Sequence, residues 1–179
     1  MVILIVLLLS YLLGCFNTGY YLVRWRTGED VRKHGSGNAG ATNAWRMLGA
    51  WAFAVALIGD AGKGALAVFL AGWLTGGDPW AMALAVPAVV AGHIWPVQLR
   101  FRGGEGIATS FGAILTLDPL VMGIICLVAL VLILLTRSRA LVGVVGLLIL
   151  VPLAFYLGRS TAEVVGLLVL LPEVAWAFR

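Results

Sequence analysis

The chain contains one polar, glycine-rich segment between long apolar runs: GSGNAGATNAWR, residues 35–46. Glycine adopts positive φ angles at low cost, so Gly35, Gly37 and Gly40 predict a tight turn. Such a turn can direct several backbone N–H groups at one point and hold an anion. The residues from Ala41 to Leu48 are typical of a helix, whose N-terminus adds partial positive charge at the same place. The segment is therefore interpreted as a phosphate site.

Polar side chains follow this turn on the expected helix. Thr42 and Asn43 precede Arg46 by four and three residues, so the three share one helical face. We expect the hydroxyl, the amide and the guanidinium to converge beside the turn. The glycines also spell GxGxxG, but a dinucleotide site would follow a strand, and here an apolar run and a charged loop precede them. A solvated connector that uses glycine only for turning is the alternative.

The composition indicates that the chain is a membrane protein. Hydrophobic residues make up 62% of the chain, charged residues 11%, and the mean hydropathy is +1.06. A soluble domain is roughly 45–50% apolar and about 25% charged. The net charge of +4 comes from basic residues spread over short loops, a pattern unlike that of a nucleic-acid-binding protein. Cys15 and Cys126 lie in apolar runs without metal-ligand spacing and are interpreted as packing residues.

The apolar runs predict membrane-spanning helices, because about 20 apolar residues cross a bilayer. The expected crossings are residues 2–23, 49–74, 80–99, 107–117, 120–135, 141–157 and 161–178. The fourth is only about 16 Å long as a helix, so it would make a thin crossing. The predicted fold is an all-α integral membrane protein of about seven transmembrane helices, one of them short, in a single polytopic domain over residues 1–179.

The basic residues predict how the helices are oriented. With the N-terminus outside, the loops 24–48, 100–106 and 137–140 and the C-terminus all face the cytoplasm. These segments hold ten of the twelve Lys and Arg residues, whereas Lys63 lies in a span and Arg159 lies outside. Short cytoplasmic loops carry such an excess of positive charge. Asp60 and Lys63, three residues apart within a span, are expected to form a structural ion pair, with Lys63 also close enough to help bind an anion.

A second polar region has the same kinds of residues as the first. It consists of GHIWP at residues 92–96, followed by FRGGEGIAT at residues 101–109. Glycines again cluster at an expected helix start, with a cation nearby and a hydroxyl in the first turn. His93 lies at the interfacial end of a span, where a packing role and a functional role are both open.

Together with DAGKG at residues 60–64, these segments resemble the bacterial acyl-phosphate:glycerol-3-phosphate acyltransferases of the PlsY type over nearly the whole chain. The resemblance implies transfer of a fatty acyl group from acyl phosphate to the 1-hydroxyl of glycerol 3-phosphate, the first step of phospholipid synthesis. It implies an enzyme of the bacterial inner membrane with a cytoplasmic active face. Acyl phosphate, glycerol 3-phosphate and membrane lipid would be its partners, without cofactor, metal or nucleic acid.

The resemblance also implies the residues of the site. Ser36, Arg46 and His93 would act in catalysis. Substrate would be bound by Gly37, Asn38, Gly40, Thr42, Asn43, Lys63, Arg102, Gly103, Gly104, Gly106 and Thr109. Acyl phosphate is a mixed anhydride with a good leaving group, so the chemistry needs positioning and charge stabilisation and no enzyme nucleophile. Ser36 is expected to orient an oxygen by hydrogen bonding.

The sequence departs from the family pattern at two places. The second motif usually reads FKGGKG, and here Arg102 and Glu105 replace the lysines. Glu105 places a negative charge beside the expected anion site, or else it caps the following helix. A third motif usually follows the last span, and this sequence ends at Arg179, about where that motif would begin. We therefore expect a divergent or truncated member, with a non-catalytic paralogue that binds lipid or phosphate and a small anion transporter as alternatives.

Overall fold

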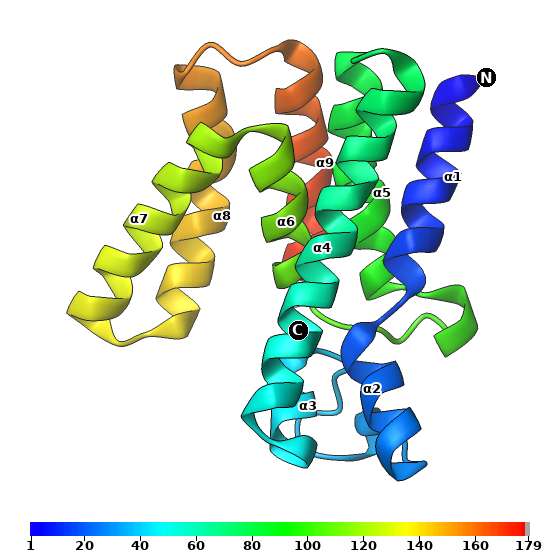
Figure 1. The fold of residues 1–179 in the computed structure, drawn as a ribbon. Coiled ribbons are helices and arrows are strands. Elements are labelled where there is room, and N and C mark those ends of the chain that lie inside the picture. Colours follow the sequence, from blue (N-terminus) through cyan, green and yellow to red (C-terminus); the bar gives the residue numbers. More distant parts are fainter. Residues whose placement is uncertain (178–179) are drawn as a thin grey trace.

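The protein is a bundle of helices in a computed structural model that describes residues 1–177, with the backbone alone at residues 139 and 140. Every regular element in the described chain is helical (Figure 1). The elements are α1 (Val2–Cys15), α2 (Thr18–Thr27), η1 (Val31–Lys33), α3 (Ala41–Leu48), α4 (Ala50–Thr75), α5 (Pro79–Ile94), η2 (Val97–Leu99), α6 (Ile107–Leu117), α7 (Pro119–Thr136), α8 (Arg139–Tyr156) and α9 (Thr161–Ala177).

The described helices begin and end close to the predicted positions. Asp78 and Asp118 accept hydrogen bonds from the first backbone amides of α5 and α7, each followed by a proline as first helical residue. The expected break at Asp118 is thus confirmed, and it leaves α6 only 11 residues long. The predicted end of the last helix, Phe178, lies outside the described residues. Four segments are long and apolar enough to cross a membrane: 2–27, 50–75, 79–99 and 119–136.

The first expected span is not one continuous helix. α1 ends at Cys15, and α2 begins at Thr18, with extended backbone at Phe16 and Asn17 between them. The amide of Asn17 is buried and donates to the carbonyl of Cys15. The prediction of an unbroken helix over residues 2–23 is therefore wrong. The break frees backbone carbonyls in the interior, and these form part of the site described below.

Helices α1 and α5 pack with their backbones in close contact. A Cβ atom at Gly14 would lie 2.1 Å from the carbonyl oxygen of Val89, and one at Gly92 would lie 2.0 Å from that of Tyr11. Only glycine fits at either position, as is common where helices pack inside membranes. This contact fixes the lower end of α5, which carries His93, against the break between α1 and α2.

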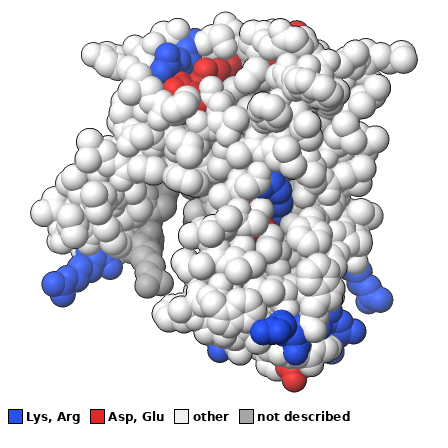
Figure 2. All heavy atoms as spheres, in the orientation of Figure 1, with Lys and Arg blue, Asp and Glu red and all other residues white. Residues whose placement is uncertain are grey.

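Charged side chains gather at the two ends of the bundle. Figure 2 shows Lys and Arg mainly at the lower end, a broad and mostly uncharged band above it, and a smaller group of both signs at the upper end. The loops between α2 and α3 and between α5 and α6 both lie at the lower end (Figure 1). The prediction that the two glycine-rich loops share one end of the bundle is therefore confirmed.

Candidate active site

The two glycine-rich loops are joined by direct hydrogen bonds. The backbone N–H of Ala39 donates to the carbonyl of Gly103 at 3.3 Å, and the amide of Asn38 donates to the carboxylate of Glu105 at 2.9 Å. These partners lie more than 60 residues apart in the sequence. The loops therefore form one structural unit at the end of the bundle.

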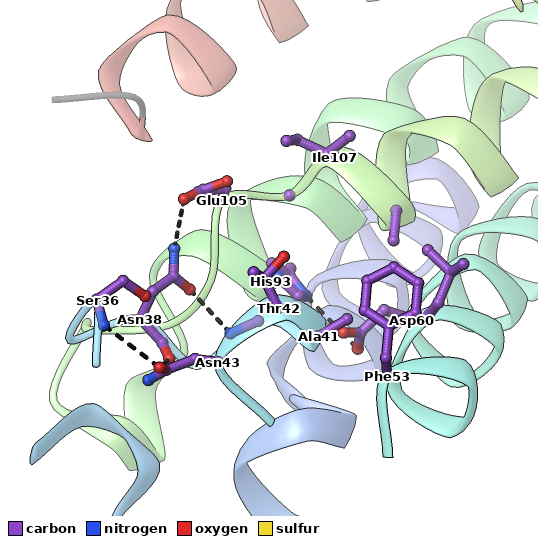
Figure 3. Close-up of a pocket in the computed structure, with 14 residues that line it drawn as sticks. Ser36, Asn38, Ala41, Thr42, Asn43, Phe53, Asp60, His93, Glu105 and Ile107 are labelled. Atoms are coloured by element: carbon purple, nitrogen blue, oxygen red, sulfur yellow. Dashed lines mark hydrogen bonds and ion pairs between the residues drawn. The ribbon is translucent and has the colours of Figure 1, made fainter. Parts of the chain in front are cut away.

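A cavity of about 210 Å³ lies where the loops meet the helices, and we call it the polar cavity because half of the 14 residues that line it carry polar side chains. It is lined by many of the predicted site residues: Ser36, Asn38, Gly40, Thr42, Asn43, His93 and Gly106. Figure 3 shows Ser36, Asn38 and Asn43 together on one side and Asp60 on the other, with Glu105 joined to Asn38. The sequence analysis did not assign Asp60 to the cavity wall, where it lies together with Phe53 and Leu57 from the same helix.

A second, larger cavity of about 550 Å³ adjoins the polar one. The two cavities share Ser36, Thr42, Glu105 and Ile107 as lining residues. Beyond them the second cavity is mainly apolar and runs between α6, α7, α8 and α9, and Arg46 lies among its few polar lining residues. Sequence reasoning missed this cavity, because its walls are ordinary apolar residues of the spans.

The side chain of Asn43 organises the first loop. The two hydrogens of its amide nitrogen are shared among the carbonyls of Val31, His34 and Asn38, which lie 2.7, 2.9 and 3.0 Å away, and its oxygen accepts from the N–H of Ser36 at 3.3 Å. The residue is 1% exposed. We expected the Thr42 hydroxyl, the Asn43 amide and the Arg46 guanidinium to converge beside the turn. This prediction is wrong for Asn43, because its amide forms hydrogen bonds with backbone groups of the loop.

The backbone amides of the first loop are largely used within the protein. The N–H of Gly37 donates to His34, that of Ala39 to Gly103 and that of Gly40 to the side chain of Asn38. The expectation that the glycine turn presents these N–H groups to a ligand is therefore wrong. The start of α3 remains a candidate anion-binding group. The first amides of a helix lack helical partners, and Ala41 and Thr42 line the polar cavity.

A buried charge cluster closes the inner end of the polar cavity. Lys63 and Asp60 form an ion pair at 3.0 Å, with side chains 7% and 2% exposed. The same carboxylate oxygen accepts from the N–H and the hydroxyl of Thr18 at 3.2 and 3.1 Å. The predicted ion pair facing the bundle is confirmed. Lys63 also contacts His93, whose Nδ1 lies 2.8 Å from Nζ.

The glycines of the second loop pack against the end of α5. The N–H groups of Gly103 and Gly104 donate to the carbonyls of Ile94 and His93 at 2.9 and 3.1 Å. A Cβ at Gly103 would lie 1.9 Å from the carbonyl oxygen of His93. These glycines are required for close approach, and their amides are used there. Thr109 is buried in α6, and its hydroxyl has no hydrogen-bond partner among the described residues.

Glu105 lies before α6 without capping it. The N-cap of α6 is Gly106, and no side chain accepts a capping hydrogen bond there. The expectation that Glu105 caps the helix is therefore wrong. Its carboxylate binds Asn38 and lines both cavities.

Arg102 and Gly37 face a separate recess of about 690 Å³ on the loop surface. Arg32 also lines it and donates to the carbonyls of Leu99 and Arg102, which ties the loops together a second time. The hydrogen bonds from Arg32 lower the pKa of Asp30. Arg102 and Gly37 therefore line this recess and not the polar cavity, although their chain neighbours Gly103, Ser36 and Asn38 belong to the joined loops.

Comparison with known proteins shows the family of this chain. Residues 4–179 match the family model described as glycerol-3-phosphate acyltransferase. The chain belongs to the glycerol-3-phosphate acyltransferase family. A family member from Desulfitobacterium hafniense is 47% identical over 138 residues, 77% of this chain and 68% of that protein. Another, from Thermoanaerobacter pseudethanolicus, is 46% identical over 131 residues, 73% of this chain and 65% of that protein.

Solved structures of the glycerol-3-phosphate acyltransferase family share this fold. Two crystal structures of PlsY (YgiH), an integral membrane glycerol 3-phosphate acyltransferase, match with TM-scores of 0.89 and 0.87 at 29% and 28% identity. Both matches cover 99% of this chain and 88% of the other, one in a glycerol 3-phosphate form and one in a lysophosphatidic acid form. The prediction of an all-helical integral membrane acyltransferase of phospholipid synthesis is confirmed at this level. The roles of single residues stay predictions.

Proposed function

We propose that the chain transfers a fatty acyl group from acyl phosphate to the 1-hydroxyl of glycerol 3-phosphate, releasing lysophosphatidic acid and phosphate. The observation that carries this proposal is the shared border of the two cavities at Ser36, Thr42, Glu105 and Ile107. A reaction between a lipid and a water-soluble substrate needs an apolar and a polar compartment that meet where the bond forms. This chain has such a meeting point.

The two substrates fit different compartments. The acyl chain of the donor lies in the apolar cavity between α6, α7, α8 and α9, with its carbonyl at the shared border. Glycerol 3-phosphate lies in the polar cavity, with its 1-hydroxyl toward that carbonyl. Holding two reactants in line in this way contributes several kcal/mol, on the order of 7–11 in the best cases.

Positive charge near the border balances the phosphate groups. Arg46 lines the apolar cavity, and Ala41 and Thr42, at the N-terminus of α3, line the polar one. Ser36 lines both cavities and orients an oxygen of a substrate by hydrogen bonding. These groups stabilise negative charge that develops on the carbonyl oxygen and the leaving phosphate.

The charge distribution supports a cytoplasmic site in a bacterial inner membrane. The end of the bundle that holds both cavities' polar parts also carries most of the basic side chains (Figure 2). In this arrangement the chain crosses seven times, with the short α6 as a thin crossing and the N-terminus outside. Glycerol 3-phosphate then enters from the cytoplasm.

The proposal is tested with the purified chain in detergent, palmitoyl phosphate and radiolabelled glycerol 3-phosphate. We expect equal amounts of phosphate and labelled lysophosphatidic acid, and no product when palmitoyl-CoA replaces palmitoyl phosphate. Binding of glycerol 3-phosphate without product would instead indicate a non-catalytic paralogue. Flux of a labelled anion into proteoliposomes, without product, would indicate a transporter.

A further inference from the structure

We propose that Lys63 fixes His93 as a hydrogen-bond donor to the polar cavity, so that His93 acts on a substrate oxygen through its Nε2–H and not as a base. Lys63 is then a positioning residue that touches no substrate. The inference rests on the proposed acyl transfer for its chemical role, but the state of the His93 ring can be measured without turnover.

The ammonium group of Lys63 is surrounded by acceptors. Its Nζ lies 2.6 Å from the carbonyl oxygen of Phe16, 2.9 Å from that of Gly14 and 3.0 Å from a carboxylate oxygen of Asp60. The break between α1 and α2 makes both carbonyls available. Carbonyl and carboxylate oxygens only accept hydrogen bonds, so this environment suits the protonated amine, which has three donors and no acceptor.

The fourth neighbour of Nζ is Nδ1 of His93, at 2.8 Å. A protonated amine cannot accept a hydrogen bond, so Nδ1 is an acceptor and carries no proton, and the three hydrogens of Nζ are shared among the four acceptors around it. In a neutral imidazole the proton is then on Nε2. Asp60 does not oppose this tautomer, because its carboxylate lies 3.7 Å from Nδ1, beyond hydrogen-bonding distance.

The other side of the ring faces the second glycine loop and the polar cavity. His93 is 3% exposed and lines that cavity (Figure 3). A Cβ atom at Gly104 would lie 2.2 Å from Nε2, so glycine at this position keeps the space beside the N–H clear. The Nε2 edge of the ring thus lies beside Gly104, next to Glu105 and Gly106, which line the same cavity as His93.

A ring held in this way has no nitrogen left to take a proton. The lone pair of Nδ1 is engaged by Lys63, and Nε2 already carries hydrogen. His93 therefore donates to a phosphoryl or carbonyl oxygen. As the bond from the glycerol oxygen to the acyl carbon forms and the bond from that carbon to the phosphate oxygen breaks, the hydroxyl proton passes to the departing phosphate. Removing one such preorganised donor typically costs about 100- to 1000-fold in kcat.

Two substitutions at His93 separate a donor from a base. His93→Gln places an amide N–H₂ near the position of Nε2 and cannot accept a proton from the hydroxyl, whereas His93→Met supplies neither function. We expect kcat of His93→Gln to exceed that of His93→Met by about tenfold or more. Equal loss of activity in both variants, or full activity in both, would overturn the donor role.

The role of Lys63 is tested by ¹⁵N NMR of histidine-labelled protein, in which His34→Gln identifies the signals of the other histidine. We expect the wild-type spectrum to show hydrogen on Nε2 and none on Nδ1 of His93. Lys63→Met should abolish this preference and lower kcat in parallel. A wild-type ring with hydrogen on Nδ1 would refute the inference, even if acyl transfer were not detected.

Discussion

Glu105 is the residue at which this chain departs most from the pattern of the family it resembles, because a carboxylate replaces a usual lysine at the border of both cavities. In the proposed arrangement, a negative charge here repels the phosphate of glycerol 3-phosphate. We expect Glu105→Lys to lower KM for glycerol 3-phosphate about five- to tenfold, since a tenfold change corresponds to about 1.4 kcal/mol. Steady-state kinetics at saturating acyl phosphate measure the effect.

The matched control is Glu105→Gln. Glutamine removes the charge but keeps an oxygen that can accept the hydrogen bond from Asn38. Its KM should fall between those of wild type and Glu105→Lys. A rise in KM for both variants would contradict the repulsion and would indicate that the carboxylate serves the reaction.

Asn43 shows a second effect at the scale of one residue, because a single amide holds the first loop together. Asn43→Ala removes the side-chain donor to the carbonyls of Val31, His34 and Asn38 together with the acceptor of the Ser36 N–H. We expect a loss of about 2–4 kcal/mol in the free energy of unfolding, which thermal denaturation in detergent would reveal as a lower Tm. Thr42→Ala, at the exposed neighbour, should change this free energy by less than about 0.5 kcal/mol. Equal Tm values for the two variants would contradict the role assigned to Asn43.

At the scale of helices, the contact between α4 and α6 depends on glycine at one position and tolerates change two residues away. A Cβ at Gly64 would lie 2.2 Å from the carbonyl oxygen of Thr109, whereas one at Gly62 meets nothing within 4 Å. Gly64→Ala must push α6 away from α4, because backbone atoms are the obstacle. We expect a loss of at least about 2 kcal/mol and reduced activity, since α6 carries part of both cavities.

Gly62→Ala is the control within the same helix. It adds the same methyl group in open space and replaces glycine by the best helix former, so stability should stay equal or rise by up to about 1 kcal/mol. Thermal denaturation of both variants in one detergent compares them directly. Similar destabilisation by both variants would contradict the decisive role of the α4–α6 contact at Gly64.

The sequence predicted most helix ends because local chemistry decides them. Asp118 and the proline after it end one helix and begin the next without help from distant residues. The break at Phe16 could not be predicted, because the apolar pattern continues through it. It is stabilised from a distance: Lys63, 47 residues later, donates to the carbonyl that the break exposes.

The candidate site was also predictable only in part. Glycine spacing located both loops, and their charges predicted that they share one end of the bundle. The use of each group was not predictable, since Asn43 and Gly104 find their partners only after the chain folds. The apolar cavity has no signal in the sequence, because a residue such as Leu150 looks alike in a packed span and in a cavity wall.

The whole molecule is polar at both ends but in different ways. The lower end carries the loops and most of the cations (Figure 2). The α6–α7 and α8–α9 connections lie at the upper end (Figure 1), where Arg159 pairs with Asp118 and links them. An end with a single cationic side chain among the described residues, Arg159, and a strongly basic end are what the positive-inside rule leads us to expect of outer and cytoplasmic faces. This asymmetry gives the proposed orientation its physical basis.

Cysteine labelling tests this orientation and the number of crossings together. In a background with Cys15→Ala and Cys126→Ala, single cysteines replace Lys33, Arg137 or Ser160, all of them exposed. A membrane-impermeant maleimide applied to intact spheroplasts should label Ser160→Cys. It should label Lys33→Cys and Arg137→Cys only after permeabilisation, because α6 and α7 cross separately and return the chain to the cytoplasm. Retained acyl transfer confirms that each variant is folded. Labelling of Arg137→Cys from outside would mean that residues 107–135 cross once, and the seven-crossing arrangement would then be wrong.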